Sequence, residues 1–360
     1  MPRGARSPPP LAERAVVAAA ARPLVMRCGA FGDMVLLTPL IRTLSTRFGT
    51  PVDIVSSGGW TRPLLDGQPG VGELFLVKSR RRPFLFSPDQ WQLVRRLRAR
   101  GVGPTWFLDG DGVGRSLLAR AGIGPEWIVE ADALPRLGGE HYLERFARIA
   151  AVNPRALRAP PVAAQASTGT ALEVSAAARA DCAAWLEARG LARRELLLLQ
   201  AGNKRTMRRG DRRRASNTKY WPEEHWAAVV AALRARHPGH AVLLLGVPSE
   251  AALNEEIRAR LADPAVLNVA AELPIPRLLA LLERAAGMVS VDTGPAHAAA
   301  ALGVPQVVLF GAAEPALYRP RGAPGAAVVC LRPDPPGSLE GLALEPVLAA
   351  VAALELRPSR

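Results

Sequence analysis

Short apolar runs alternate with segments of helical periodicity along the first half of the chain. Runs with the length of a buried strand occur at 24–28, 52–56, 74–77 and 105–108. Apolar residues recur with helical spacing at 34–48, 88–100 and 140–151. Pro39 lies inside the first helical pattern and predicts a kink there. Strands that alternate with helices predict a parallel, doubly wound sheet.

The second half repeats this alternation after a proline-containing stretch, 153–170, that is typical of a linker. Its apolar runs occur at 196–200, 241–245, 266–269, 288–291, 306–310 and 327–331. Its helical patterns occupy 175–189, 222–236, 249–261, 274–285, 296–302 and 342–354. The predicted fold class is therefore α/β, with two Rossmann-like domains facing each other across a cleft.

These patterns also predict the domain boundaries. A flexible arm rich in proline and arginine covers 1–22, because such a composition cannot bury a core. The first Rossmann-like domain is expected at 23–160 and the second at 161–340. A C-terminal helical segment is expected at 341–360.

The stretch 288–311 reads as strand, tight loop, short helix and strand. Asp292, Thr293 and Gly294 end the first strand, and Pro295 suits the first turn of a helix. His297 lies one turn further along. Helix N–H groups would then point into a loop at the carboxyl end of a strand, where α/β folds bind anionic ligands. We interpret the stretch as a nucleotide-binding corner.

Composition and charge narrow the function classes. The chain has 360 residues and a formal net charge of +14, which favours a polyanionic partner such as a phosphosugar, a lipid surface or a nucleic acid. No apolar run approaches the roughly 20 residues of a membrane span, and no convincing signal peptide precedes the first strand. The 3 cysteines are scattered, which fits a reducing cytosol. His and Cys spacing predicts no bound metal.

A glycine-bearing loop, Gly29-Ala-Phe-Gly-Asp33, opens the first helix. Glycines let the backbone approach a ligand, but the pattern is neither a full dinucleotide fingerprint nor a P-loop. Asp33 could be the general base of a group transfer. The alternative is a helix N-terminal residue that accepts hydrogen bonds from backbone donors.

Two further segments carry candidate chemistry. Lys219 precedes a helix and could hold a phosphate, and Trp221 and Trp226 are expected to pack that helix. Glu250 follows Gly246 at a strand end, where it could accept from ribose hydroxyls or simply complement a helix dipole, with Ser249 as the N-cap.

The arginine-rich stretch 203–214 is either a solvated loop or a phosphate-contacting acceptor loop. It includes Arg205 and Arg208. Nucleic-acid contact ranks below both, because no recognised nucleic-acid-binding fold surrounds it.

Three motifs in order give the chain a family resemblance. They are Arg27 to Pro39 (RCGAFGDMVLLTP), Lys219 to Pro222 (KYWP), and Val291 to His297 (VDTGPAH) continuing to Gly311. Together they resemble the family 9 glycosyltransferases, the heptosyltransferase family of lipopolysaccharide core synthesis, over about 24–320. The resemblance implies a GT-B fold with an acceptor domain first, a nucleotide-sugar domain second, and a C-terminal helix that returns to the N-terminal domain.

The resemblance also implies site roles and partners. Asp33 matches the base and Lys219 the cation at the leaving diphosphate. Asp292, Thr293, Gly294 and His297 match the donor loop, with Glu250 and Gly246 at the ribose; Gly29, Phe31, Gly32, Arg205 and Arg208 are assigned to the acceptor. The implied enzyme is inverting and uses neither metal nor cofactor. Its donor is expected to be ADP-heptose, and its acceptor an anionic glycolipid or core oligosaccharide.

The chain departs from the family pattern in two places, and two alternative functions remain. The 202–219 loop is longer and richer in arginine than in many members, and Gly202-Asn-Lys replaces a commoner His-Pro-Gly start. Both leave the acceptor open. The alternatives are a non-catalytic nucleotide-sugar binder and a sugar-nucleotide epimerase of similar fold. No nucleic-acid partner is expected, and the protein is expected in the cytoplasm, at most peripheral on the inner membrane.

Overall fold

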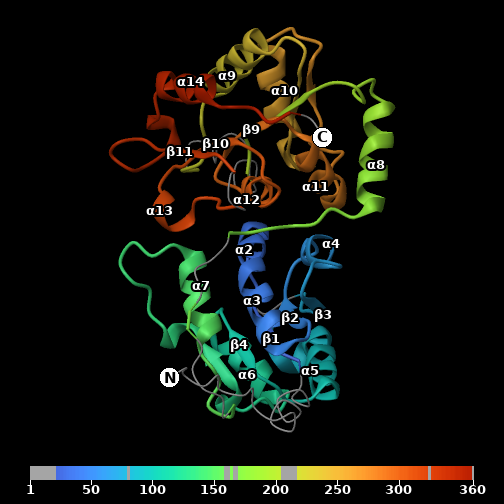
Figure 1. The fold of residues 1–360 in the computed structure, drawn as a ribbon, viewed down its shortest axis with the longest axis vertical. Coiled ribbons are helices and arrows are strands. Elements are labelled where there is room, and N and C mark those ends of the chain that lie inside the picture. The colour runs from blue at the N-terminus through green and yellow to red at the C-terminus, as the bar shows by residue number, and fades with distance from the viewer. Residues whose placement is uncertain are drawn as a thin grey trace, which may run out of the picture. The chain divides into compact units, whose positions relative to one another are not determined.

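A computed structural model describes residues 22–78, 82–157, 163–164, 169–203, 217–322 and 326–358. The chain forms two compact units (Figure 1). The first unit is drawn from Met1–Gly29, Leu40–Leu137 and Arg145–Ala166. The second is drawn from Ala30–Pro39, Gly138–Glu144 and Ser167–Arg360. Both units are therefore discontinuous in sequence.

The first unit contains a parallel sheet in the order β3-β2-β1-β4-β5. Its strands are β1 (Leu24–Met26), β2 (Val52–Ser56), β3 (Val71–Leu76), β4 (Thr105–Phe107) and β5 (Ile128–Glu130). Its helical elements are α3 (Thr38–Phe48), which begins in the second unit, α4 (Thr61–Leu65), η1 (Phe84–Phe86), α5 (Pro88–Arg100), α6 (Gly112–Arg120), η2 (Pro125–Trp127), η3 (Ala131–Ala133) and most of α7 (Tyr142–Ala151).

Helices cover both faces of this sheet because successive strand residues point to opposite faces. Phe107 packs in a cluster with Leu93 of α5 and Leu117 of α6. Its neighbour Trp106 points the other way, stacks edge-to-face on Phe48 and donates to the Ile149 carbonyl. The predicted doubly wound pattern is thus present in this unit.

A buried carboxylate ties β2 to α5. The Asp53 side chain is fully buried, accepts from the Glu73 amide at 2.8 Å, and pairs with Arg100 Nε at 2.6 Å. Arg22 lies 3.4 Å away on the exposed side. A buried charge is tolerated only when it is paired and hydrogen-bonded in this way.

The second unit contains a parallel sheet in the order β11-β10-β9-β6-β7-β8. Its strands are β6 (Leu196–Gln200), β7 (Ala241–Leu244), β8 (Val266–Asn268), β9 (Gly287–Val291), β10 (Gln306–Leu309) and β11 (Val328–Leu331). Its helical elements are α2 (Phe31–Leu36), α8 (Ala176–Glu187), α9 (Glu223–Arg236), η5 (Pro248–Glu250), α10 (Ala251–Ala259), α11 (Ile275–Arg284), α12 (Gly294–Ala301), α13 (Pro315–Tyr318), η6 (Leu339–Gly341) and α14 (Leu344–Ala353).

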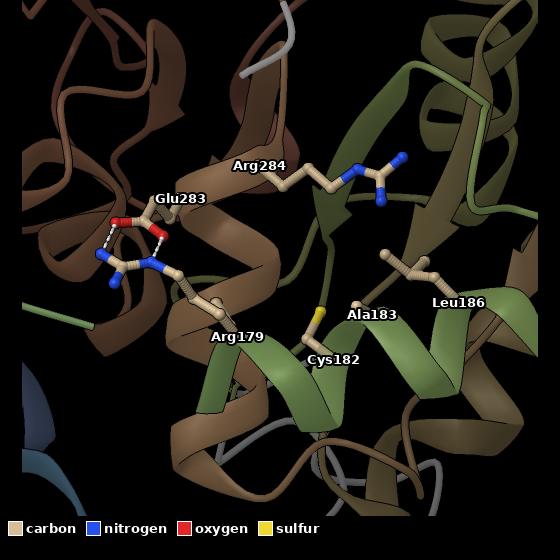
Figure 2. A pocket seen from close by; sticks show the side chains of 7 residues that line it. Arg179, Cys182, Ala183, Leu186, Glu283 and Arg284 are labelled. Carbon is tan, nitrogen blue, oxygen red and sulfur yellow. Dashed lines mark hydrogen bonds and ion pairs between the residues drawn. The ribbon is translucent and has the colours of Figure 1, made fainter. Parts of the chain in front are cut away.

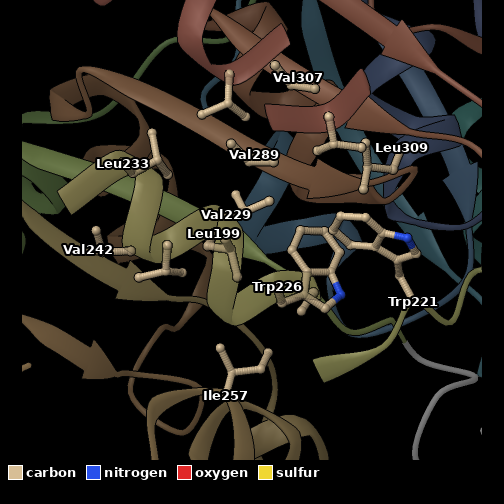
Figure 3. Packing of buried hydrophobic residues seen from close by; sticks show 14 of the residues in the cluster. Leu199, Trp221, Trp226, Val229, Leu233, Val242, Ile257, Val289, Val307 and Leu309 are labelled. Atoms are coloured by element: carbon tan, nitrogen blue, oxygen red, sulfur yellow. The ribbon is translucent and has the colours of Figure 1, made fainter. Parts of the chain in front are cut away.

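The main core of the second unit lies between the sheet and the helices α9, α10 and α14 (Figure 3). Leu199, Val242, Val289 and Val307 supply it from four adjacent strands. Trp226 stands edge-on to Trp221, with ring centroids 5.0 Å apart, and both are almost fully buried. The prediction that these tryptophans pack the helix is confirmed.

The last helix packs within the second unit. α14 lies beside α9 there (Figure 1), and the expected return of the C-terminal helix to the N-terminal domain stays a prediction. Val347 and Val351 join the core around Trp221, whose indole N–H donates to the Leu342 carbonyl at 2.9 Å. The apolar face of α14 is therefore already satisfied within this unit.

The C-terminal tail fastens two neighbouring helix ends. Arg357 donates to Leu282 O at 2.8 Å and to Ala285 O at 2.7 Å at the end of α11. It also donates to Leu302 O at 2.9 Å at the end of α12. Carbonyls at helix C-termini lack intrahelical partners, so one guanidinium satisfies the ends of both helices.

Other local differences have simple causes. The predicted helix 34–48 is two helices, because the chain breaks at Leu37 before Thr38-Pro39. The pattern missed α4, α6 and β5, which are short or interrupted by glycine or proline. Ser249 is not an N-cap, since it lies inside η5 and α10 follows.

Among the helices of the described residues, none has both the length and the apolar composition of a membrane span.

Candidate active site

The strand order of the second unit fixes where a ligand would bind. From β6 the chain adds β7 and β8 on one side, and then β9, β10 and β11 on the other. The order thus reverses between β6 and β9, which pair in parallel with Gln200 opposite Ser290. In open α/β sheets the crevice at the carboxyl ends of two such strands is the binding position. The residues that follow Gln200 and Val291 meet at this edge.

Asp292 and Lys219 form an ion pair at this edge. The Lys219 ammonium donates to Asp292 Oδ2 and to the Asp292 carbonyl oxygen, each at 2.6 Å. Asp292 follows β9 directly, whereas Lys219 comes from the segment before α9. Two predicted site residues separated by 73 positions are therefore in contact.

His297 completes this group. It lies in the first turns of α12, and its Nε2 is 3.7 Å from Asp292 Oδ1. Burial by itself raises the pKa of Asp292, but the contacts with His297 and the Lys219 ammonium outweigh it and lower the pKa to about 2. His297 Nδ1 and Thr293 Oγ1 have no hydrogen-bond partner among the residues described. Both atoms are buried and retain unused hydrogen-bonding capacity.

The segment that carries Lys219 is held by its neighbours. Asn217 Oδ1 accepts from the Lys219 amide at 3.2 Å, and the Leu339 amide donates to Thr218 O at 3.0 Å. Thr218 O also lies so close to Gly311 that a β-carbon at position 311 would overlap it. Asn217 and Gly311 are thus positioning residues whose part in the site the sequence pattern did not show.

Glu250 occupies a small buried niche beside β6. Its Oε2 accepts from the Val247 amide at 2.9 Å and from Gln200 Nε2 at 3.3 Å. A β-carbon at Gly246 would lie 2.8 Å from Oε2, so the glycine leaves room for the carboxylate. Burial raises the pKa of Glu250, and its two hydrogen bonds act against that rise. The bond from the Val247 amide is a helix N-terminal contact, so the ribose and helix N-terminus interpretations of Glu250 both stay predictions.

The glycine-bearing loop contributes α2, which packs on α12 within the second unit. A β-carbon at Gly294 would overlap the Phe31 ring, so position 294 requires a glycine for this packing. A β-carbon at Gly32 would lie 2.9 Å from His297 Cδ2. Phe31 and Gly32, assigned to the acceptor from sequence, therefore lie against the helix of the predicted donor loop.

Asp33 is a half-buried residue of the first turn of α2, and its Oδ2 accepts from the Ala30 amide at 2.7 Å. This is the backbone contact that the simpler interpretation expects. A carboxylate held in this way still has acceptor sites for a second partner. Its role as a base stays a prediction.

The first unit has its own reversal of strand order, between β1 and β4. Gly29 follows β1 there, and the preceding Cys28 amide donates to Asp109 Oδ2 at 2.8 Å. Arg27 Nη1 lies 3.4 Å from Asp109 Oδ1. Arg205 and Arg208 lie outside the described residues.

The second unit also has a pocket away from these residues. A pocket of about 350 Å³ lies between α8 and α11 (Figure 2), where Arg179 and Glu283 form a paired contact at 2.7 and 2.8 Å beside Cys182. None of the predicted site residues lines this pocket.

Across 22–78, 82–157 and the other described ranges, no group of three or more His, Cys, Asp or Glu side chains is placed to hold a metal ion.

Several residues of this site lie in a stretch that matches a known protein family. Residues 210–334 match the family model described as glycosyltransferase family 9 (heptosyltransferase). This stretch contains Lys219, Glu250, Asp292 and His297. This part of the second unit is similar to glycosyltransferase family 9. The resemblance seen in the motifs is confirmed.

Curated relatives of family 9 match over a limited stretch. Lipopolysaccharide heptosyltransferase 3 of Escherichia coli is 36% identical over 104 residues, which are 28% of this chain and 30% of that protein. Lipopolysaccharide heptosyltransferase 1 of Pseudomonas aeruginosa is 39% identical over 122 residues, which are 33% of this chain and 32% of that protein. The matched stretch thus spans about a third of each curated relative.

Solved structures of family 9 proteins match over nearly the whole chain. A glycosyl transferase family 9 protein from Veillonella parvula has a TM-score of 0.73 at 17% identity and covers 92% of this chain and 96% of that one. E. coli heptosyltransferase WaaC with ADP has a TM-score of 0.67 at 20% identity, with coverage of 92% and 99%. At these identities the likeness shows the fold, and the predicted α/β fold of GT-B type is confirmed.

Proposed function

We propose that this protein transfers a heptose-like sugar from a nucleoside diphosphate to a lipopolysaccharide core acceptor or a related glycolipid. The Lys219–Asp292–His297 group at the β6/β9 reversal carries the proposal. It supplies a cation, unpartnered polar atoms and a helix N-terminus at one sheet edge, a combination suited to a diphosphate. ADP-heptose is the first donor to test, since the relatives matched are lipopolysaccharide heptosyltransferases.

The contacts of Lys219 and the start of α12 support a way of binding the donor nucleotide sugar. An ammonium has three N–H donors, and Asp292 takes two of those of Lys219, so the third is directed at the donor diphosphate. The amides of Gly294 and Ala296 at the start of α12 add partial positive charge. Glu250 accepts from the ribose hydroxyls and His297 Nδ1 contacts the sugar or phosphate. Positive charge held in place would stabilise the leaving group without a metal.

The transfer step assigns Asp33 as general base. The acceptor hydroxyl oxygen forms a bond to the anomeric carbon on the face opposite the diphosphate, and the bond from that carbon to the diphosphate oxygen breaks. The hydroxyl proton passes to the Asp33 carboxylate, and the configuration inverts. The nucleoside diphosphate leaves with its added charge beside Lys219. Gly29, Phe31 and Gly32 stay assigned to the acceptor in this proposal.

The test is ADP release from ADP-heptose with a heptose-deficient core acceptor. Asp33→Asn keeps the shape and the contact with the Ala30 amide but removes the base, so we expect at least a hundredfold loss of kcat with little change in donor affinity. Full turnover by folded Asp33→Asn would reject the base assignment. Donor binding without transfer to any acceptor would favour the non-catalytic binder, and a changed donor sugar without acceptor consumption would favour the epimerase.

Donor identity needs its own measurement. A ligand that binds the folded state raises thermal stability by mass action. We expect ADP-heptose to raise Tm more than UDP- or GDP-sugars at equal concentration. Asp292→Asn should reduce that increase for every nucleotide sugar, whereas the exposed double variant Arg193→Gln/Arg194→Gln should not.

A further inference from the structure

The start of α5 exposes three large apolar side chains close together in sequence. Leu85 is 69% exposed and Phe86 is 70% exposed, both in η1. Trp91, in the first turns of α5, is 47% exposed. We call these three residues the apolar ridge. Isolated exposed apolar residues are ordinary, but a cluster that includes two aromatic side chains marks an interaction site.

The ridge is held in place by defined contacts. Trp91 Nε1 donates to the Phe84 carbonyl at 2.7 Å, and the two rings meet edge-to-face at 6.5 Å. Arg120 lies over the Phe84 ring at 4.2 Å. Phe84 is therefore fixed beneath the ridge, while the next two residues along the chain remain on the surface.

Basic side chains surround the ridge. The exposed residues Lys78 and Arg82 precede it, and the exposed residues Arg95 and Arg98 follow Trp91 at spacings of four and seven. Positions with this spacing share one helix face, so Trp91, Arg95 and Arg98 form a stripe along α5.

The segment stays basic, because Asp89 is the one acidic residue between Lys78 and Arg98 in the sequence. The opposite face of α5 is buried and carries Leu93, Val94 and Leu97. The carboxylate of Asp89 is engaged by the Lys78 amide at 2.9 Å and by the Ser87 hydroxyl at 2.8 Å. Its charge is directed into the turn that begins the helix.

This combination selects one kind of partner. Aromatic and aliphatic side chains next to lysine and arginine suit the interface of a bilayer that contains anionic lipid. A second copy of the chain fits poorly, because a twofold contact would place the basic residues against themselves. Three side chains also offer only a few hundred Å², below the roughly 800 Å² per partner of a stable protein interface.

We propose that Leu85, Phe86 and Trp91, with Lys78, Arg82, Arg95 and Arg98 around them, dock the protein on the surface of an anionic bilayer. The apolar ridge enters the interface and the basic side chains contact the lipid headgroups. This goes beyond the proposed transfer reaction, because it concerns where the protein resides and uses no residue of the candidate active site.

The experiment is co-sedimentation of the 360-residue chain with vesicles of phosphatidylcholine, with and without phosphatidylglycerol. We expect binding only to the anionic vesicles, and weaker binding at high salt. Leu85→Ser/Phe86→Ser should reduce the partition coefficient at least tenfold. Arg95→Gln/Arg98→Gln should reduce it about fivefold per charge removed.

Matched controls separate this surface from general effects. Val102→Ser removes an apolar side chain that is 39% exposed in the same unit, and Arg193→Gln/Arg194→Gln removes two exposed arginines elsewhere. Neither control should change binding by more than twofold. Equal binding by all variants, or no preference for anionic vesicles, would overturn the proposal. So would a concentration-dependent dimer that Leu85→Ser/Phe86→Ser abolishes.

ADP release with a delipidated, water-soluble core acceptor distinguishes this proposal from the proposed function. The Leu85→Ser/Phe86→Ser variant should keep wild-type turnover with that acceptor while losing vesicle binding. Absence of turnover by the wild-type protein would argue against the transferase and leave the vesicle result standing.

Discussion

Gly32 lies directly against the imidazole of His297, so that a β-carbon at position 32 would be 2.9 Å from Cδ2. We predict that Gly32→Ala displaces the ring and weakens nucleotide-sugar binding about tenfold. The protein should lose about 1–3 kcal/mol of stability at most, the usual effect of overpacking. Titration of the donor by calorimetry and urea unfolding measure the two effects.

The control for this substitution is Gly239→Ala, which has open space around the added methyl group in the same unit. It should leave both donor affinity and stability close to wild type. Wild-type donor affinity in Gly32→Ala would show that His297 does not contact the donor, or that the ring moves without consequence.

Lys219 and Asp292 should be strongly coupled, because the replacement of either one removes the ion pair. We predict that Lys219→Gln and Asp292→Asn each destabilise the fold by about 2–3 kcal/mol. The double variant should recover more than 1 kcal/mol of the summed loss. Catalysis should behave differently, since the double variant still lacks the cation and should stay at least a hundredfold below wild-type kcat.

A double-mutant cycle of urea unfolding, run beside kcat for all four proteins, measures both quantities. Additive stability effects would contradict the ion pair. Recovery of kcat in the double variant would show that Lys219 only neutralises Asp292 and has no part at the leaving group.

The low pKa of Asp292 predicts a specific acid dependence of stability. A carboxyl whose folded pKa is about 2 contributes stability that is fully present above its unfolded pKa. That contribution, about 2 kcal/mol from the difference in pKa, is lost as the pH falls from about 5 towards 2. The stability difference between wild type and Asp292→Asn should therefore be constant from pH 8 to 5 and shrink below it. A difference that shrinks between pH 8 and 6 would assign the titration to another group.

Glu250 should show the opposite sign. Burial raises its folded pKa, so its contribution to stability is present at low pH and is lost as the pH rises through that pKa. Glu250→Gln removes the buried charge while its amide oxygen can still accept from Val247 and Gln200.

We predict that Tm of Glu250→Gln exceeds that of wild type at pH 8 and that the two converge below pH 4. Donor affinity should fall about tenfold at pH 8 if the carboxylate accepts from the ribose, because a charged acceptor is lost. Scanning calorimetry and donor titration at both pH values test this. Unchanged donor affinity would leave Glu250 as a structural residue.

Sequence patterns predict a helix or strand well where its own residues show a clear periodicity or a turn signal. The run Leu196 to Gln200 is a fully buried central strand, and the corner after β9 turns at Asp292 to Gly294 as its residues require. α6 was missed because its first turn, Gly112 to Gly114, lacks helix formers. β5 was missed because three residues are too short for a periodic pattern.

Long-range contacts left no such signal. In the sequence, Asp53 is a polar residue within an apolar strand. Its ion-pair partner, Arg100, is 47 positions away, so the sequence around Asp53 does not reveal the pair. Likewise, nothing near Gly32 in sequence shows that it faces His297, and nothing near Gly311 shows that it faces Thr218. The candidate residues could be named from motifs, but their mutual contacts depend on packing between distant segments.

The tail residue Arg357 has an electrostatic consequence at the opposite end of α12. Its guanidinium meets the carbonyl end of that helix at Leu302. The negative pole of the helix is thus neutralised, whereas the positive pole at Gly294 keeps its full attraction for an anion. A protein shortened by its last four residues would have a weaker field at the proposed nucleotide corner, although the cut lies at the far end of the helix.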